Sequence, residues 1–312
     1  MPENRDNVLF DEPMNQRDCL AESQNSTVTP SSPRRGRWAG RVAILIAALI
    51  TLGPVVYFGL PAEIARWHVA AGMEMWENGR RQEALAQLEA ALRWTEDNPD
   101  IYVCRADWWL NDGQYEKALE DYNRALALEP NHFGAFVQRC EAYQHLGRHA
   151  EAIRDWKELV ARHQSASGGG RAVLLNGLAY AQSLDTSKKP ELDKALENII
   201  QAINLAGQNP RVGQDAAMLD TRGYIHYRRG NLAAAEVDLN LAVNEMEKQL
   251  NQEERTRHRR EFNEELEMMR KSLAVIRYHR ALVFDALGKS KEAEADRRRV
   301  RELGFVPAPS LF

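Results

Sequence analysis

Two histidines come nearest to the spacing of a metal site. His145 and His149 are four residues apart, which on one continuous helix would place both imidazole rings on the same face, as a zinc ion requires. Gly147 stands between them, and glycine is the residue that most often ends a helix. We therefore expect the two histidines to lie on opposite sides of a turn, with no third ligand nearby, and we predict no metal or other cofactor.

Other chemistry-bearing residues are equally sparse. The three cysteines, Cys19, Cys104 and Cys140, are too scattered for a disulfide scaffold or a zinc site, and the last two are expected to be small buried packing residues. The sequence has no Gly-x-Ser-x-Gly, no His-Glu-x-x-His, no phosphate-binding glycine loop and no dinucleotide fingerprint. The chain is therefore predicted not to be an enzyme. A regulatory subunit, or an enzyme whose site no motif reveals, stays open.

The composition narrows the class of partner. The 312 residues carry 41 Lys+Arg against 45 Asp+Glu, a formal net charge of -4, which argues against a basic nucleic-acid-binding protein. Hydrophobic residues make up 44% and charged residues 28%, the range of a folded globular body. We expect no nucleic acid among the partners.

The N-terminal part divides into a polar tail and an apolar segment. Residues 1–37 are rich in polar residues without apolar periodicity, and we expect a disordered tail with a basic end. No charged residue occurs from Val42 to Ala62, a length that reaches about 30 Å as a helix, the hydrocarbon thickness of a bilayer. Residues 38–62 are therefore predicted to form one transmembrane helix.

Charge around this segment predicts its orientation. Four arginines, Arg34, Arg35, Arg37 and Arg41, precede it directly. The positive-inside rule then places the N-terminus in the cytoplasm and the rest of the chain outside it, in the periplasm if the organism is a bacterium. The opposite topology, with an organelle-anchored chain facing the cytosol, remains an alternative.

A repeat follows the apolar segment. Gly79, Gly113 and Gly147 are 34 residues apart, and an alanine follows each glycine by five residues. The clearest copy, around Gly113, also contains Tyr122 and Pro130. A glycine turn, small residues where two helices meet and a proline at the end are typical of a repeated helical hairpin.

These motifs resemble the tetratricopeptide repeat (TPR) family, whose unit is a 34-residue helix-turn-helix. The resemblance implies an all-α fold, an α-solenoid of about six TPR-like units over residues 63–304, with a C-terminal tail at 305–312. The units lie near 65–98, 99–132, 133–166, 170–209, 216–249 and 274–306.

Two stretches depart from the 34-residue period. Gly230 and Gly288 are 58 residues apart, and the extra residues at about 244–272 have helical apolar spacing. We expect them to lengthen two helices into a hairpin that turns near 252–257. The Ser-Gly-rich stretch at 165–170 is expected to be a surface loop or a hinge. The hairpin and the uncapped C-terminal end are two places where a second copy could bind.

The resemblance also implies where partners bind: in a concave groove lined by the first helix of each unit. Projecting the repeat onto this face gives ten candidate residues: Trp76, Asp100, Asp107, Asn111, Glu141, Gln144, Tyr224, Tyr227, Arg228 and Tyr278. The same projection includes Val69, Met73, Leu174 and Leu178. Because the candidate face combines acidic and aromatic residues, we expect a protein or peptide ligand with a basic portion beside Asp107 and Glu141.

Together these features predict a membrane-anchored TPR scaffold or adaptor. It would bind protein partners through its groove and serve the assembly or maintenance of an envelope protein complex. A TPR receptor that faces the cytosol is the alternative within the binding class.

Overall fold

The computed structural model describes residues 59–164, 168–185, 189–207, 214–256 and 263–307. Within these ranges all regular elements are helices and no strand occurs, which confirms the all-α prediction. The predicted tail and residues 38–58 of the predicted membrane segment lie outside the described residues. No helix in the described ranges has both the length and the apolar composition needed to cross a membrane.

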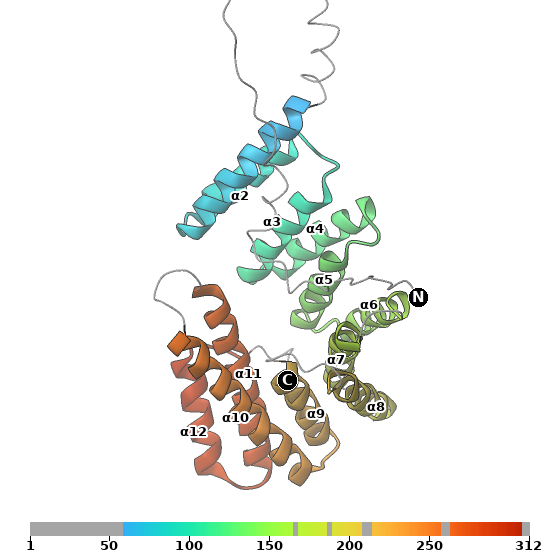
Figure 1. Cartoon of the computed structure of the whole chain (residues 1–312), viewed down its shortest axis with the longest axis vertical. Coiled ribbons are helices and arrows are strands. Elements are labelled where there is room, and N and C mark those ends of the chain that lie inside the picture. Colours follow the sequence, from blue (N-terminus) through green and yellow to red (C-terminus); the bar gives the residue numbers. More distant parts are fainter. Residues whose placement is uncertain (1–58, 165–167, 186–188, 208–213, 257–262, 308–312) are drawn as a thin grey trace, which may run out of the picture. The chain divides into compact units, whose positions relative to one another are not determined.

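The helices follow one another in sequence and pair as antiparallel hairpins (Figure 1). A first helix covers residues 59–77. It is followed by α2 (Arg81–Leu92), α3 (Pro99–Asn111), α4 (Tyr115–Leu128), α5 (Phe133–His145), α6 (His149–Arg162), α7 (Gly168–Leu184), α8 (Lys189–Ala206), α9 (Gln214–Arg228), α10 (Leu232–Thr256), α11 (Asn263–Ala286) and α12 (Ser290–Glu302).

Glycines in the left-handed backbone region form the turns inside the hairpins. At Gly113 φ is 73°, its N–H donates to the carbonyl of Leu110 at 3.0 Å, and the N–H of Gln114 donates to that of Trp109 at 2.8 Å. A side chain in this region costs about 1–2 kcal/mol, so the turn favours glycine. The same conformation occurs at Gly79, Gly147, Gly230 and Gly288. The predicted glycine turns are confirmed.

The chain divides into two compact units, with the boundary between Arg139 and Cys140 inside α5. The described part of the N-terminal unit contains the helix over 59–77, α2, α3, α4 and the start of α5. Its core includes Leu88, Ile101 and the fully buried Trp108. Cys104 lies in the same core, which confirms the prediction that it is a packing residue.

The C-terminal unit contains the end of α5 and the helices from α6 to α12. Cys140 is completely buried there. Two clusters of apolar side chains form much of its interior, one around Ile199 and Met218 and the other around Leu239 and Leu273. Helices α7 and α8, α9 and α10, and α11 and α12 pack as pairs.

Arginine–aspartate pairs join the two helices of three hairpins. In each pair the residues are 16 apart in sequence and the guanidinium makes two hydrogen bonds to one carboxylate. The pairs are Arg105–Asp121 (2.7 and 2.7 Å), Arg222–Asp238 (2.8 and 2.6 Å) and Arg280–Asp296 (2.7 and 2.8 Å). Bidentate geometry is the strong form of this contact, so the pairs fix the two helices of a hairpin against each other.

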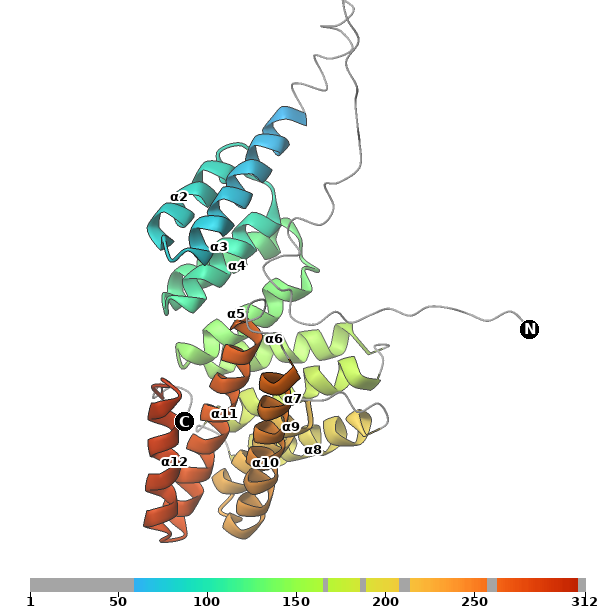
Figure 2. The ribbon, with the colours of Figure 1, turned by 60° about the vertical axis from the view of Figure 1, so that its left-hand side comes forward.

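The longest helices, α10 and α11, lie side by side (Figure 2). Met246 and Leu250 on α10 share a core cluster with Leu273 on α11. Arg270 of α11 donates to Glu254 of α10 at 2.9 Å. Their apolar stripes therefore pack on each other along the stretch where the sequence departs from the 34-residue period.

Residues 168–170 are helical and form the first turn of α7, so this half of the predicted Ser-Gly-rich loop belongs to a helix. The other half, 165–167, lies outside the described residues. At the C-terminal end, Val306 is 84% exposed, and residues 308–312 of the predicted tail also lie outside the described ranges.

Candidate functional site

The candidate residues occupy the first helices of the hairpins, in two separate sets. In the N-terminal unit, Trp76 lies on the helix over 59–77, and Asp100, Asp107 and Asn111 lie on α3. The C-terminal unit holds the other six: Glu141 and Gln144 on α5, Tyr224, Tyr227 and Arg228 on α9, and Tyr278 on α11. The candidate residues therefore form two separate sets, one in each unit.

In the N-terminal unit, Trp76 is half-buried and already stacked. Its ring lies parallel to that of Trp108, with 4.7 Å between centroids and 6° between planes. The guanidinium of Arg81 lies 5.1 Å from the Trp76 centroid, a cation–π distance. Both contacts hold the indole of Trp76 in one orientation.

The two aspartates of α3 each have a partner. Asp100 Oδ1 lies 3.2 Å from His132 Nε2, and the Nδ1 of the same histidine accepts the N–H of Ala135 at 3.1 Å, so Nε2 is the nitrogen that carries the proton. This hydrogen bond lowers the pKa of Asp100. Asp107 is half-buried and accepts the hydroxyl hydrogen of Tyr122 at 2.6 Å. With a side chain 66% exposed, Asp100 is the more open negative charge.

In the C-terminal unit, Glu141 is the exposed acid. Its side chain is 50% exposed, and its carboxylate lies 3.8 Å from His145 Nε2. Gln144, one residue before that histidine, is buried. A ligand that reaches this part of α5 would therefore contact Glu141 rather than the amide of Gln144.

Tyr224 belongs to the interior. It is 1% exposed, and its ring stacks on that of His279 with 4.3 Å between centroids. His279 Nδ1 in turn lies 2.8 Å from Asp220 Oδ1. Because α11 packs directly on α9, it covers the position that the repeat pattern assigns to an open face. Burial raises the pKa of Tyr224.

The residues next to Tyr224 are only partly covered. Tyr227, Arg228 and Tyr278 are half-buried. Arg228 Nη1 donates to the carbonyl of Ser183 at 2.7 Å, which fixes the guanidinium against the end of α7. These three side chains remain the accessible part of the predicted aromatic patch.

Four apolar residues that the repeat pattern projects onto the face are also buried: Val69, Met73, Leu174 and Leu178. They pack between helices, since an apolar side chain on a first helix gains more from a neighbouring repeat than from water. The prediction that these four side chains line an exposed face was wrong. The Asp220–His279 pair and the Arg–Asp pairs were not predicted from the sequence, although the latter carry a signal in their repeated spacing of 16 residues.

The arrangement offers little for catalysis or metal binding. His145 ends α5 and His149 begins α6, on either side of Gly147, which confirms the predicted turn between them. In the described ranges no group of three His, Cys, Asp or Glu side chains is placed to hold a metal ion.

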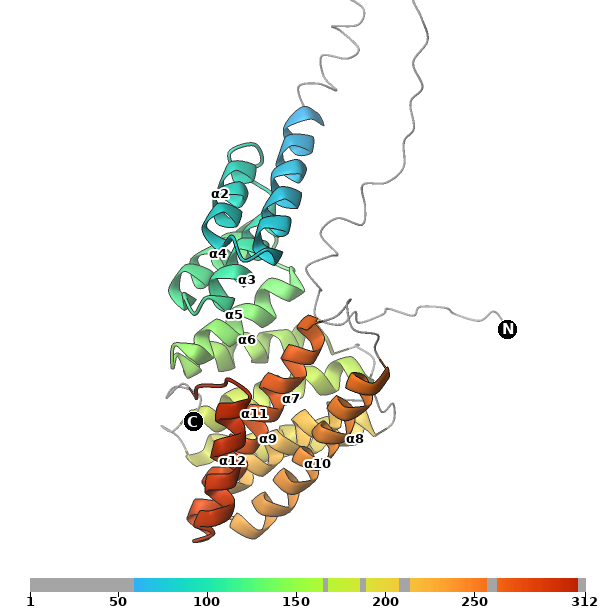
Figure 3. The ribbon, with the colours of Figure 1, turned by 90° about the vertical axis from the view of Figure 1, so that its left-hand side faces the viewer.

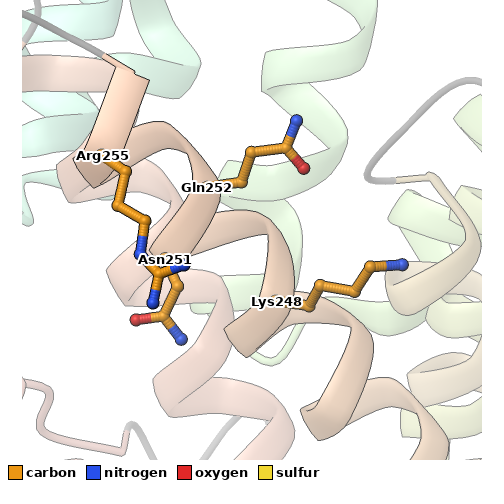
Figure 4. Close-up of a pocket in the computed structure, with 4 residues that line it drawn as sticks. All are labelled: Lys248, Asn251, Gln252 and Arg255. Carbon is orange, nitrogen blue, oxygen red and sulfur yellow. The ribbon is translucent and has the colours of Figure 1, made fainter.

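A shallow hollow of about 440 Å³ lies along α10, beside Lys248, Asn251, Gln252 and Arg255 (Figure 4). Asn251 and Arg255 extend to one side of the helix, whereas Lys248 and Gln252 extend to the other. These four side chains do not converge on one point, as groups that share a proton transfer must.

His149 and His226 are half-buried histidines of the C-terminal unit, and burial is the main cause that lowers the pKa of each. The folded chain therefore binds protons on these rings less readily than the unfolded chain. Their neutral forms contribute stability above a pH of about 6.5, and this contribution is lost as the pH falls through the lowered pKa values.

We therefore expect the His149→Gln variant to lose less stability than the wild type between about pH 7.5 and pH 5, the range that spans an unperturbed histidine. Urea unfolding followed by circular dichroism at both pH values measures the difference. An identical pH dependence of the two proteins would contradict a contribution from His149.

Comparisons with known proteins agree with this architecture. The family profile described as "Tetratricopeptide repeat" matches residues 99–132. A TPR repeat-containing protein of Pseudomonas aeruginosa is 29% identical over 188 residues, 59% of this chain and 28% of that protein. Mitochondrial import receptor subunit TOM34 of Mus musculus is 33% identical over 99 residues, 29% of this chain and 32% of that protein. The chain thus spans less than a third of the length of these relatives.

Solved structures share the fold. A tetratricopeptide repeat protein from Parabacteroides merdae has a TM-score of 0.57 at 19% identity, over 85% of this chain and 89% of that one. PilW, a widely conserved type IV pilus biogenesis factor, has a TM-score of 0.53 at 15% identity, over 80% of this chain and 96% of that one. Residues 99–132 therefore match a tetratricopeptide repeat, and the described helices share the all-α fold of these solved structures.

Proposed function

We propose that the chain is a membrane-anchored scaffold that binds protein or peptide partners and serves the assembly or maintenance of an envelope protein complex. Binding partners through stacked helical hairpins is the role of TPR scaffolds in general, since their repeats offer extended surfaces rather than closed pockets. The anchor is proposed from the uncharged sequence between Val42 and Ala62 and the arginines before it.

The observation that carries the binding role is the presence, in each unit, of an exposed acid on the first helix of a hairpin. Asp100 and Glu141 have side chains 66% and 50% exposed, and a histidine nitrogen lies 3.2 Å and 3.8 Å from their carboxylates. A solvent-facing carboxylate attracts and orients a basic segment of a ligand. We propose that each unit binds such a segment on its own face, with Tyr227, Arg228 and Tyr278 adding contacts in the C-terminal unit.

A second candidate is a receptor that faces the cytosol. It is favoured by the 33% identity to mitochondrial import receptor subunit TOM34 over 99 residues. The two candidates differ in the side of the membrane on which the repeats lie. Protease treatment of cells or organelles, before and after the outer membrane is opened, distinguishes the two candidates. The scaffold candidate requires that the protease cleave the repeats from the non-cytoplasmic side of the membrane.

The binding role is tested by in-cell cross-linking and affinity capture of the full-length protein. We expect Glu141→Lys to lose partners that the wild type captures, because the reversed charge repels a basic ligand. Glu120→Lys is the matched control, since Glu120 is an exposed acid on the second helix of a hairpin, α4. Equal capture by all three proteins would refute ligand binding at Glu141, and equal loss in both variants would indicate a non-specific charge effect.

A further inference from the structure

The helix over residues 59–77 is apolar on two opposite faces. One face carries Ala65, Val69 and Met73, which are buried in the core of the N-terminal unit. Leu60 and Trp67 lie on the opposite face, seven residues and therefore two helical turns apart, and are 51% and 64% exposed. A helix that packs on one side normally has a polar face toward water. We therefore expect a second surface to cover the apolar stripe that includes Leu60 and Trp67.

The stripe is confined to the beginning of the helix. Leu60, the half-buried Ile64 and Trp67 follow one another at helical spacing. The start of this helix extends past the end of α2 (Figures 2 and 3). Farther along the same face Glu74 is polar and exposed, and the polar, exposed Asn78 directly follows the helix. The change from apolar to polar thus runs along the helix axis, as it does for a helix that leaves an apolar medium.

The sequence before the helix indicates which medium this is. Residues 42–58, which directly precede it, contain no charge. If the apolar segment ends at Ala62, Trp67 lies about 7.5 Å beyond it at about 1.5 Å per residue, which is the outer edge of a headgroup layer about 5–7 Å thick. Tryptophan is enriched at this depth. A stable contact with a second copy would instead need about 800 Å² per partner, more than three side chains provide.

We propose that this stripe contacts a lipid bilayer, with Leu60 at the end of the apolar segment and Ile64 and Trp67 in the headgroup layer, and that it holds the N-terminal unit against the membrane surface. This inference depends on the proposed membrane anchor. Because the opposite face of the same helix packs on α2 and α3, contact of the stripe with lipid fixes the orientation of the first two hairpins relative to the membrane. The N-terminal unit would then be held at a set angle to the membrane rather than on a free tether.

The test uses the full-length protein in vesicles of phosphatidylcholine and phosphatidylglycerol whose acyl chains carry bromine, which quenches nearby tryptophans. Trp67→Phe is compared with Trp94→Phe, because Trp94 is also exposed, at 48%, but follows α2. We expect Trp67→Phe to lose roughly half of the bromine-dependent quenching, since Trp38 is the other tryptophan near the apolar segment. Trp94→Phe should leave it unchanged.

Three results would overturn the inference. If the protein floats with the vesicles after carbonate washing but Trp67→Phe is quenched like the wild type, the anchor stands and the stripe does not contact lipid. If the protein does not stay with the vesicles, the anchor itself fails. If Trp67→Phe converts a dimer in the membrane to a monomer, the stripe binds a second copy. Circular dichroism of both variants confirms that the fold is retained.

Discussion

Replacing Asp296 by asparagine is expected to lower the free energy of unfolding by about 3–5 kcal/mol, the cost of breaking a buried ion pair by removing one partner. The carboxylate of Asp296 is 3% exposed and accepts two hydrogen bonds from Arg280, at 2.7 and 2.8 Å, and another from Arg277. Both guanidinium groups are about 15% exposed. An amide cannot neutralise Arg280, so the variant leaves its poorly solvated positive charge without a carboxylate partner between α11 and α12, whereas Arg277 keeps its ion pair with Glu247.

Urea unfolding followed by circular dichroism measures this loss. Glu302→Gln is the matched control, because the Arg299–Glu302 pair on the same α12 has side chains 47% and 52% exposed. Exposed pairs contribute about 0–1 kcal/mol, so the control should unfold nearly as the wild type does. Similar unfolding of both variants would show that the Arg280–Asp296 pair does not stabilise this hairpin.

Replacing Gly177 by alanine is expected to lower the free energy of unfolding by about 1–3 kcal/mol, the usual cost of overpacking. In an unconstrained helix the same substitution would stabilise by up to about 1 kcal/mol. The sign is reversed here because a Cβ at Gly177 would lie 2.5 Å from Cη2 of Trp156 and 2.6 Å from its Cζ2. The indole is almost completely buried and has little room to move.

Gly169→Ala is the control for this prediction. Gly169 lies in the same helix, α7, and no atom lies within 4 Å of the position that its Cβ would take. We expect the control to be neutral or slightly more stable than the wild type. The Trp156→Leu substitution should reduce the additional cost of Gly177→Ala in a double-mutant cycle. Equal effects of the two alanine substitutions would rule out the contact with Trp156 as the cause.

Local pattern was enough to predict the hairpins and their turns. Gly79, Gly113 and Gly147 recur every 34 residues because a left-handed turn needs glycine, and that requirement is met within a few residues. Cys104 and Cys140 were expected to be buried because they lie on the first helices of adjacent repeats. The recurrent spacing of arginine and aspartate, as in Arg105 and Asp121, was also present in the sequence and could have been used.

Exposure on the candidate faces could not be predicted in the same way. The repeat pattern assigned Tyr224 to an open face, but His279 covers its ring. His279 is held there by Asp220, which is 59 residues away in the sequence. Gln144 is buried although Glu141, three residues earlier, is exposed. Whether a side chain faces water depends on how closely the next repeat packs, and that distance is not encoded in one repeat.

The sequence by itself therefore determined the all-α repeat, its glycine turns and the helices that carry the candidate residues, because each depends on interactions between near neighbours in the chain. Only the tertiary structure decided which of those residues are accessible. Asp100 and Glu141 remain exposed, and Tyr224 does not, because burial is a sum over contacts from helices that are distant in sequence.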